Sequence, residues 1–219
     1  MTLKEKRARM AAVSAELERI YPTAECALEY NGDPWRLLVM GRLSAQCTDA
    51  RVNIVSKELF ERFPTPEALA AAELSEIEKI IMPCGLFRTK AESIKAASAM
   101  LVTEYGGTLP DTMDELLRFP GVGRKIANLL LGDIFGKAAI VCDTHCIRIC
   151  GRLGMYPESE KNAEKVERIL RTVIDPEKGS DFCHRIVFFG RETCTARSPR
   201  CEECRLAPYC LHREKRLKK

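Results

Sequence analysis

The chain has 219 residues, of which 46% are hydrophobic and 30% are charged, and its net charge is +4. This composition is typical of a folded globular protein rather than a disordered chain, and the length allows one large domain or two small ones. No segment approaches the ~20 apolar residues of a membrane span. We therefore expect a protein that does not associate with a membrane.

The first 22 residues predict an amphipathic helix. They contain several basic residues, and their short apolar runs are interrupted by Glu16, Glu18 and Arg19. A secretory signal would need a continuous apolar stretch instead. Without an export signal, a chain with 11 cysteines, an odd number, is expected in a reducing cytoplasm. In that compartment, clustered cysteines indicate metal ligands rather than disulfides.

Four further helix starts carry side-chain signals. Asp33 and Thr65 each precede a proline, which predicts an N-cap followed by Pro at the first helical position. Ser75 with Glu78 and Thr112 with Glu115 have the spacing of a capping box. Apolar residues at helical spacing then recur in three segments, 52–63, 90–104 and 163–174.

Strand-like alternation is nearly absent, since the short stretch 138–142 is the only candidate. The chain is therefore predicted to be all-α, with about ten helices. Cysteine content changes near Gly136, with three cysteines before it and eight from Cys142 onward. Two helical lobes are expected, with the break around 136–142.

Basic charge is concentrated near the C-terminus. Residues 191–219 hold nine Lys and Arg against four acids, a net of +5, while the other 190 residues have a net of −1. A local basic excess is typical of a surface that binds phosphate groups. For the last five residues a solubilising tail is the simpler interpretation.

Four cysteines form the pattern C-x6-C-x2-C-x5-C, and they are Cys194, Cys201, Cys204 and Cys210. Four thiolates in so short a segment can converge on one centre, which favours zinc or an iron–sulfur cluster. The spacing tilts only mildly towards a cluster, because zinc sites usually show two short pairs. With four cysteines and no histidine, the site is expected to be structural.

Cys142, Cys146 and Cys150 lie on one face of a predicted helix. His145 lies next to them, so a second metal site is conceivable. Buried thiols that act as small apolar residues are the more usual explanation for such a stripe.

Residues 116–132 predict two helices joined by a Pro-Gly-Val-Gly turn. Gly121 and Gly123 can adopt positive φ and allow close approach of another backbone. The unpaired N–H groups at the start of the second helix favour an anion, and the phosphates of a nucleic acid suit that geometry. Arg124 and Lys125 follow the turn and add positive charge.

Three polar residues near these motifs have two interpretations each. Lys125 fits a neutral amine nucleophile or a solvated lysine that touches phosphate. Asp143 precedes an apolar helix, so it is first of all an N-cap, and a chemical role would need it to approach the reacting group. His145 fits a structural residue or a phosphate contact.

The chain resembles the endonuclease III family of the helix-hairpin-helix DNA glycosylase and AP lyase superfamily. The motifs that carry the resemblance occur in family order over essentially the whole chain: LSAQCTD (43–49), GLFRTKAESI (85–94), FPGVGRKIAN (119–128), VCDTH (141–145) and C-x6-C-x2-C-x5-C (194–210). The combination is highly specific, whereas each motif alone is weaker.

This resemblance implies two lobes on either side of a DNA-binding cleft. Residues 27–137 would form a barrel-like six-helix lobe that contains the helix-hairpin-helix motif at 116–132. Residues 1–26 and 138–219 would form the second lobe and hold a [4Fe-4S] cluster through the four cysteines.

The resemblance also implies a role for individual residues. Lys125 matches the lysine that attacks the sugar C1′ and forms a Schiff base, and Asp143 matches the aspartate that supports bond cleavage electrostatically. Gln46 matches the residue that fills the gap left by the flipped nucleotide, and Leu86 matches the wedge beside the orphaned base. Backbone amides of the hairpin would hold a phosphate, and they belong to Gly121, Val122 and Gly123.

The implied activity is base excision repair, with removal of oxidised pyrimidines from duplex DNA and β-elimination at abasic sites. The partner would be double-stranded DNA with damaged pyrimidines or abasic sites. The protein would be a monomer in the bacterial cytoplasm, associated with the nucleoid through DNA. A mismatch-specific thymine or uracil glycosylase is the nearest alternative, and a catalytically silent, metal-stabilised DNA-binding module is another.

The sequence departs from the family pattern at a few positions. Phe119 replaces a leucine, Ile126 replaces the threonine common after the lysine, and Cys142 replaces a small apolar residue. Gly41-Arg42 interrupts a helix that is usually apolar. None of these departures removes a group that the chemistry requires, but Arg42 and Ile126 leave the preferred lesion open.

Overall fold

The computed structural model describes residues 1–213 of the chain. Within that range the protein consists of helices and loops without a strand, so the predicted all-α class is confirmed. The strand-like stretch 138–142 is an irregular segment. Four of the nine basic residues in the C-terminal segment lie outside the described residues: Lys215, Arg216, Lys218 and Lys219.

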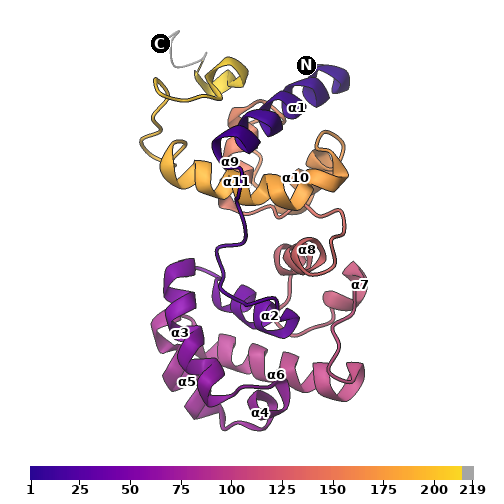
Figure 1. Ribbon diagram of the computed structural model, residues 1–219, viewed down its shortest axis with the longest axis vertical. Helices are drawn as coiled ribbons and strands as arrows, with labels where there is room; N and C mark the ends of the chain where they lie inside the picture. The colour runs from indigo at the N-terminus through magenta and orange to yellow at the C-terminus, as the bar shows by residue number, and fades with distance from the viewer. Residues whose placement is uncertain (214–219) are drawn as a thin grey trace. The chain divides into compact units, whose positions relative to one another are not determined.

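The chain divides into two compact units, one of residues 26–136 and one of residues 1–25 with 137–219. The unit of residues 26–136 is fully described, and its elements appear in violet to pink in Figure 1. They are α2 (Pro34–Leu43), α3 (Asp49–Arg62), α4 (Pro66–Ala71), α5 (Leu74–Ile81), η1 (Met82–Cys84), α6 (Phe87–Tyr105), α7 (Met113–Leu116) and α8 (Arg124–Asp133). This unit has seven α-helices where six were expected, because α7 is a single turn of four residues.

Helix α6 is the central element of this unit. It packs against α2, α4, α5 and η1, while α2 also packs against α8. Ile94, Ala97 and Leu101 of α6 are buried at helical spacing, as the apolar period predicts. The Trp35 indole of α2 donates to the Ser98 hydroxyl of α6 at 2.9 Å, which fixes the two helices by a buried polar contact.

The other unit combines the N-terminal helix with the C-terminal half of the chain. Its elements are α1 (Leu3–Ile20), α9 (Thr144–Arg152), α10 (Ala163–Leu170), η2 (Pro176–Lys178), α11 (Gly179–Glu192) and η3 (Ala207–Tyr209). Helix α11 packs against both α1 and α9. Burial of the thiol stripe is confirmed, and the thiol of Cys146 lies against those of Cys142, Cys150 and Cys183.

Most of the predicted helix starts are present. Asp33, Thr65 and Thr112 each accept a hydrogen bond from the backbone N–H three residues later. The prediction for Ser75 is wrong, because α5 begins at Leu74 after Glu73, which makes no side-chain cap. Burial of Ile77 and Ile81 sets the register of this helix, and packing outweighs the local capping signal.

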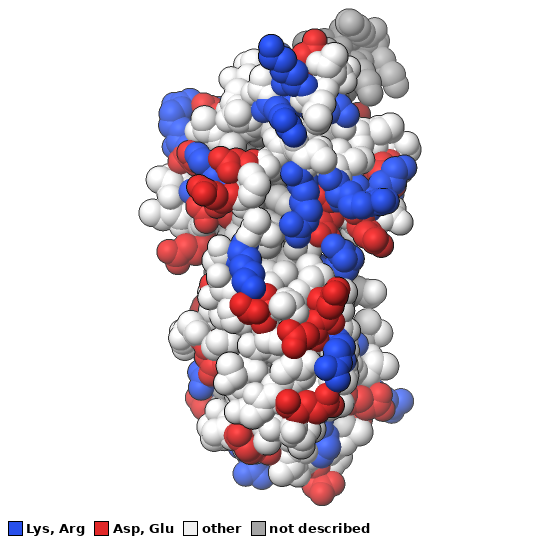
Figure 2. Space-filling view, turned by 90° about the vertical axis from the view of Figure 1, so that its right-hand side faces the viewer, with Lys and Arg blue, Asp and Glu red and all other residues white. Residues whose placement is uncertain are grey.

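Charges of both signs are interspersed on the face shown in Figure 2. Net charge is therefore a poor guide to a binding surface in this protein. No helix of the described residues is long and apolar enough to cross a membrane.

Candidate functional site

The hairpin turn between α7 and α8 presents unpaired amides. Gly121 has a φ of +78°, and the N–H of Val122 donates to the Phe119 carbonyl at 3.0 Å. The backbone N–H groups of Gly121, Gly123 and Lys125 have no hydrogen-bond partner within residues 1–213. Because such N–H groups and the helix dipole favour negative charge, this turn can hold a phosphate.

Side chains from two other helices lie directly beneath the turn. A Cβ atom added to Gly121 would lie 2.7 Å from Nε of Arg42 on α2 and 2.7 Å from Cβ of Ser93 on α6. Such distances are not tolerated without a shift of the neighbours. Glycine is therefore required here both by close packing and by its positive φ.

We expect Gly121→Ala to lower the free energy of unfolding by about 1–3 kcal/mol, because it combines an overpacked contact with a strained φ. Gly123→Ala is the matched control, since Gly123 has a φ of −102° and open space around the added Cβ. Urea denaturation of both variants checks this, and equal stabilities would contradict the packing argument.

Lys125 lies in the first turn of α8, two residues after Gly123. Its side chain is exposed and makes no hydrogen bond or ion pair with any residue that the structure describes. The next residue, Ile126, is buried and anchors this turn of the helix. Lys125 is thus held on a rigid element with its amine available to a ligand.

Gln46 and Leu86 lie on two loops of the same unit, and both have the left-handed backbone conformation, with φ of +54° and +49°. Such conformations are uncommon for residues with a side chain and often occur at functional sites. Gln46 is exposed, and the Leu86 side chain is 55% exposed despite being apolar. Both side chains are placed to reach a partner.

Lys90 holds these two loops together. Its side chain is fully buried, and its Nζ donates to the carbonyl of Leu43 at 2.9 Å and to that of Cys84 at 2.8 Å. Leu43 precedes the Gln46 loop, and Cys84 precedes Leu86 by two residues. Burial lowers the pKa of Lys90 below its ordinary value. Lys90 was not predicted from the sequence, although its position on the apolar face of α6 indicates that its side chain is buried.

Asp143 is the N-cap of α9, as its position before the helix predicts. Its Oδ1 accepts the N–H of Cys146 at 2.7 Å. No other hydrogen bond of this half-buried carboxylate is made within residues 1–213, so Oδ2 can face a ligand. Cys142 and Cys146, on either side of this cap in the sequence, are both buried. Asp143 is thus oriented by the fold and keeps one oxygen for chemistry.

His145 is packed into its own unit. Its Nδ1 contacts Nη2 of Arg148 at 3.1 Å, and a Cβ added to Gly190 of α11 would lie 2.3 Å from this atom. The ring therefore fits closely against α11. This placement gives His145 a structural role, and its contact with DNA stays a prediction.

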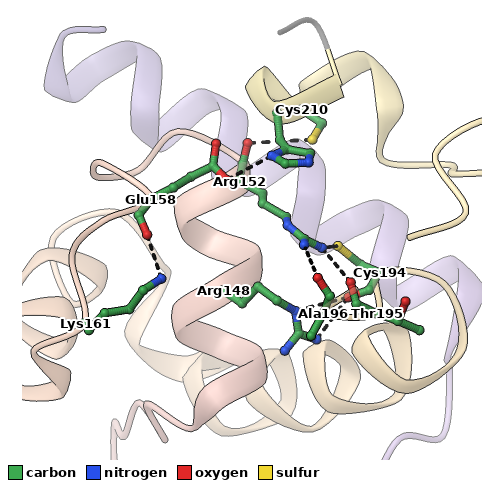
Figure 3. A network of polar contacts seen from close by, with 9 residues as sticks. Arg148, Arg152, Glu158, Lys161, Cys194, Thr195, Ala196 and Cys210 are labelled. Atoms are coloured by element: carbon green, nitrogen blue, oxygen red, sulfur yellow. Dashed lines mark hydrogen bonds and ion pairs between the residues drawn. The ribbon is translucent and has the colours of Figure 1, made fainter. Parts of the chain in front are cut away.

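The four spaced cysteines line one partly open cavity. Arg152 is buried and approaches it, with Nη1 donating to Sγ of Cys194 at 3.1 Å (Figure 3). Its guanidinium also donates to the carbonyls of Thr195 at 2.8 Å and Ala196 at 2.9 Å. The loop after Cys194 is thus fixed to helix α9.

The four spaced thiols fit the ligand set of an iron–sulfur cluster. They surround one cavity, as they would around a four-iron cluster whose irons each bind one cysteine. Burial raises the pKa of the Cys204 thiol to about 11, a penalty on the thiolate that coordination to iron offsets.

Comparison with known proteins identifies the family. Residues 39–176 match the HhH-GPD superfamily of base excision DNA repair proteins, and residues 194–210 match the iron–sulfur binding domain of endonuclease III. Endonuclease III of Bacillus subtilis is 44% identical over 91% of this chain and 90% of its own length. The chain belongs to the endonuclease III family.

Two solved structures of endonuclease III support this assignment. A non-covalent complex of endonuclease III with DNA has a TM-score of 0.91 and 40% identity, and it covers 100% of both chains. A trapped covalent endonuclease III–DNA intermediate has a TM-score of 0.90 and 40% identity, and it covers 99% of both chains.

Membership of the endonuclease III family confirms the predicted class of activity. The protein is a base excision DNA glycosylase with AP lyase activity, and its cofactor is a [4Fe-4S] cluster. The mismatch-specific and catalytically silent alternatives are not favoured. The second match begins and ends at the first and last of the four spaced cysteines.

Proposed function

We propose that the protein binds duplex DNA, removes oxidised pyrimidines and then cleaves the strand at the abasic site through a Schiff base on Lys125. The observation that supports this most is the exposed Lys125 amine, which directly follows the unpaired amides of the hairpin. The protein would act as a monomer in the cytoplasm of a bacterium, where it meets chromosomal DNA.

The hairpin binds the DNA backbone independently of the base sequence. Amides of Gly121 and Gly123 donate to a backbone phosphate, which fixes the strand next to Lys125. Gln46 fills the gap left by the flipped nucleotide, and Leu86 is the wedge beside the orphaned partner base. Extrusion costs a few kcal/mol and is easiest for a base whose stacking or pairing is already weakened. Damaged bases are therefore favoured over intact ones.

Lys125 then acts as the nucleophile. Its neutral amine attacks C1′, the C1′–N bond to the base breaks, and the base leaves as an anion that takes a proton from water. The attached amine then gives one of its two protons to O4′ as the C1′–O4′ bond breaks and the sugar ring opens, which leaves an iminium between Nζ and C1′. The carboxylate of Asp143 stabilises the positive charge that develops at the sugar.

The iminium is an electron sink that makes the proton on C2′ acidic. Loss of that proton expels the 3′ phosphate by β-elimination, so that the strand is cut 3′ to the lesion. Water hydrolyses the imine and regenerates Lys125. Each of these steps uses protein side chains and water alone, and Cys194, Cys201, Cys204 and Cys210 bind the cluster as a structural group.

Borohydride trapping tests this proposal. We expect the wild-type protein to cut a duplex with a single thymine glycol 3′ to the lesion and to be trapped covalently on it, as on an abasic-site duplex. A duplex with a G·T mismatch is expected to stay intact. Binding without trapping would indicate a silent module, and preferential cleavage of the mismatched duplex would indicate the mismatch-specific activity.

A further inference from the structure

Two departures from the family pattern lie together beneath the hairpin. A Cβ added to Gly41 would lie 3.2 Å from Cγ2 of Ile126, so the missing side chain makes room for a larger residue after Lys125. The neighbouring Arg42 extends under Gly121, within 2.7 Å of where a Cβ would be. The two departures thus form one packing arrangement, and it places a guanidinium directly under the turn.

Arg42 has no partner that explains its presence there. Its Nε is buried without a hydrogen bond, and the described part of the chain offers it no ion pair. Arg36 also has a buried Nε without a hydrogen bond, but that atom lies 3.4 Å from the carboxylate of Asp33. Arg42 is therefore a half-buried cation whose donors are not used by the described fold.

Guanidinium groups that serve the fold of this protein are satisfied. Arg152 donates to two carbonyls and to Cys194, and Arg185 donates to the Tyr21 carbonyl at 3.0 Å and to Asp181 at 3.2 Å. A buried donor left unpaired costs about 1–3 kcal/mol. Arg42 is better explained as a residue whose partner arrives with a ligand.

The positive charges around Arg42 favour an anion as that ligand. The positive charge of Arg42 acts on the buried Lys90, whose pKa is lowered by burial first and by Arg42 as well. Arg124 and Lys125 open the helix that follows Gly121. The unpaired amides of Gly121 and Gly123 add partial positive charge at the same turn.

We propose that Arg42 contacts a backbone phosphate of the DNA strand that the hairpin holds, as a positioning residue for Lys125. This inference rests on the proposed function, because it assumes that the hairpin binds DNA. A planar guanidinium donates two parallel hydrogen bonds to a phosphate. Since phosphate contacts carry no sequence information, Arg42 strengthens binding to damaged and undamaged duplexes alike and leaves lesion preference unchanged.

The salt dependence of binding tests this contact. Fluorescence anisotropy would give Kd for the whole protein on an undamaged duplex and on a duplex with a tetrahydrofuran abasic-site analogue, over a series of KCl concentrations. Loss of one phosphate contact makes the slope of log K against log[KCl] shallower by about 0.9. We expect Arg42→Leu to show this change and to weaken binding to both duplexes by the same factor.

Two variants control for charge and packing. Arg42→Lys keeps the charge but not the planar fork, so it should keep the slope and bind more weakly than wild type. Arg62→Leu removes an equal charge from an exposed ion pair with Glu76 at 2.9 Å, and its slope should equal that of wild type. Circular dichroism and the visible absorbance of the cluster report whether each variant is folded.

An unchanged slope in folded Arg42→Leu, or the same change in Arg62→Leu, would overturn the phosphate contact. Borohydride trapping of the wild-type protein separates this outcome from failure of the proposed function. If the wild-type protein is trapped but the slope of Arg42→Leu is unchanged, only the phosphate contact of Arg42 is refuted. If the slope of Arg42→Leu is shallower but the wild-type protein is not trapped, the Schiff-base chemistry is refuted and the Arg42 contact stands.

Discussion

Lys125→Gln is expected to abolish covalent trapping on thymine-glycol and abasic-site duplexes. Glutamine keeps a polar, unbranched side chain that is one atom shorter than lysine, but its amide nitrogen has no lone pair that can attack C1′. Loss of a covalent nucleophile lowers the rate on the order of 10⁴-fold or more. Single-turnover cleavage of a labelled duplex, with and without borohydride, measures this effect.

Lys4→Gln is the matched control, because Lys4 occupies the same position in the first turn of α1 as Lys125 does in α8. It is also exposed and makes no side-chain hydrogen bond or ion pair with another described residue. Its cleavage rate should equal that of wild type. Persistent trapping by Lys125→Gln would show that another amine forms the Schiff base.

Binding should survive the Lys125→Gln change. The unpaired amides of Gly121 and Gly123 belong to the backbone, so they stay in place when the Lys125 side chain is altered. We therefore expect the variant to hold the damaged duplex without cutting it. This separation of binding from chemistry distinguishes a missing nucleophile from a collapsed hairpin.

Local features of the fold were predictable from the sequence. Asp33, Thr65 and Asp143 cap helices because their side chains bond to a backbone N–H three residues away, a short-range contact that the sequence shows directly. The predicted cap at Ser75 is absent because burial of Ile77 and Ile81 sets the register of that helix. The hairpin was predictable because its turn is a local Pro-Gly-Val-Gly sequence, in which Gly121 adopts the positive φ.

Contacts between distant segments were not predictable from spacing. Arg42 and Gly121 are far apart in sequence, and only the folded unit shows that they touch. Lys90 is a charged residue within an apolar stretch, and two carbonyls from different segments satisfy it in the core. His145 likewise fits against α11 through Gly190, a contact that depends on tertiary packing.

Asp143→Asn is expected to lower the rate of base removal on the order of 10²–10³-fold, as loss of one electrostatic group aimed at the transition state does. Asparagine caps helices about as well as aspartate, so the bond to the Cys146 N–H and the fold should be kept. The variant therefore removes the negative charge while retaining the geometry. Single-turnover excision of thymine glycol measures the effect.

Asp33→Asn makes the same change at another helix N-cap, where Oδ1 accepts the Arg36 N–H at 3.1 Å, and its excision rate should equal that of wild type. Asp143→Ala removes the cap as well, so it should also lower the free energy of unfolding by about 1 kcal/mol. Comparison of the two Asp143 variants separates charge from capping. If Asp143→Asn excised thymine glycol at the wild-type rate, the carboxylate would be a helix cap without a part in the chemistry.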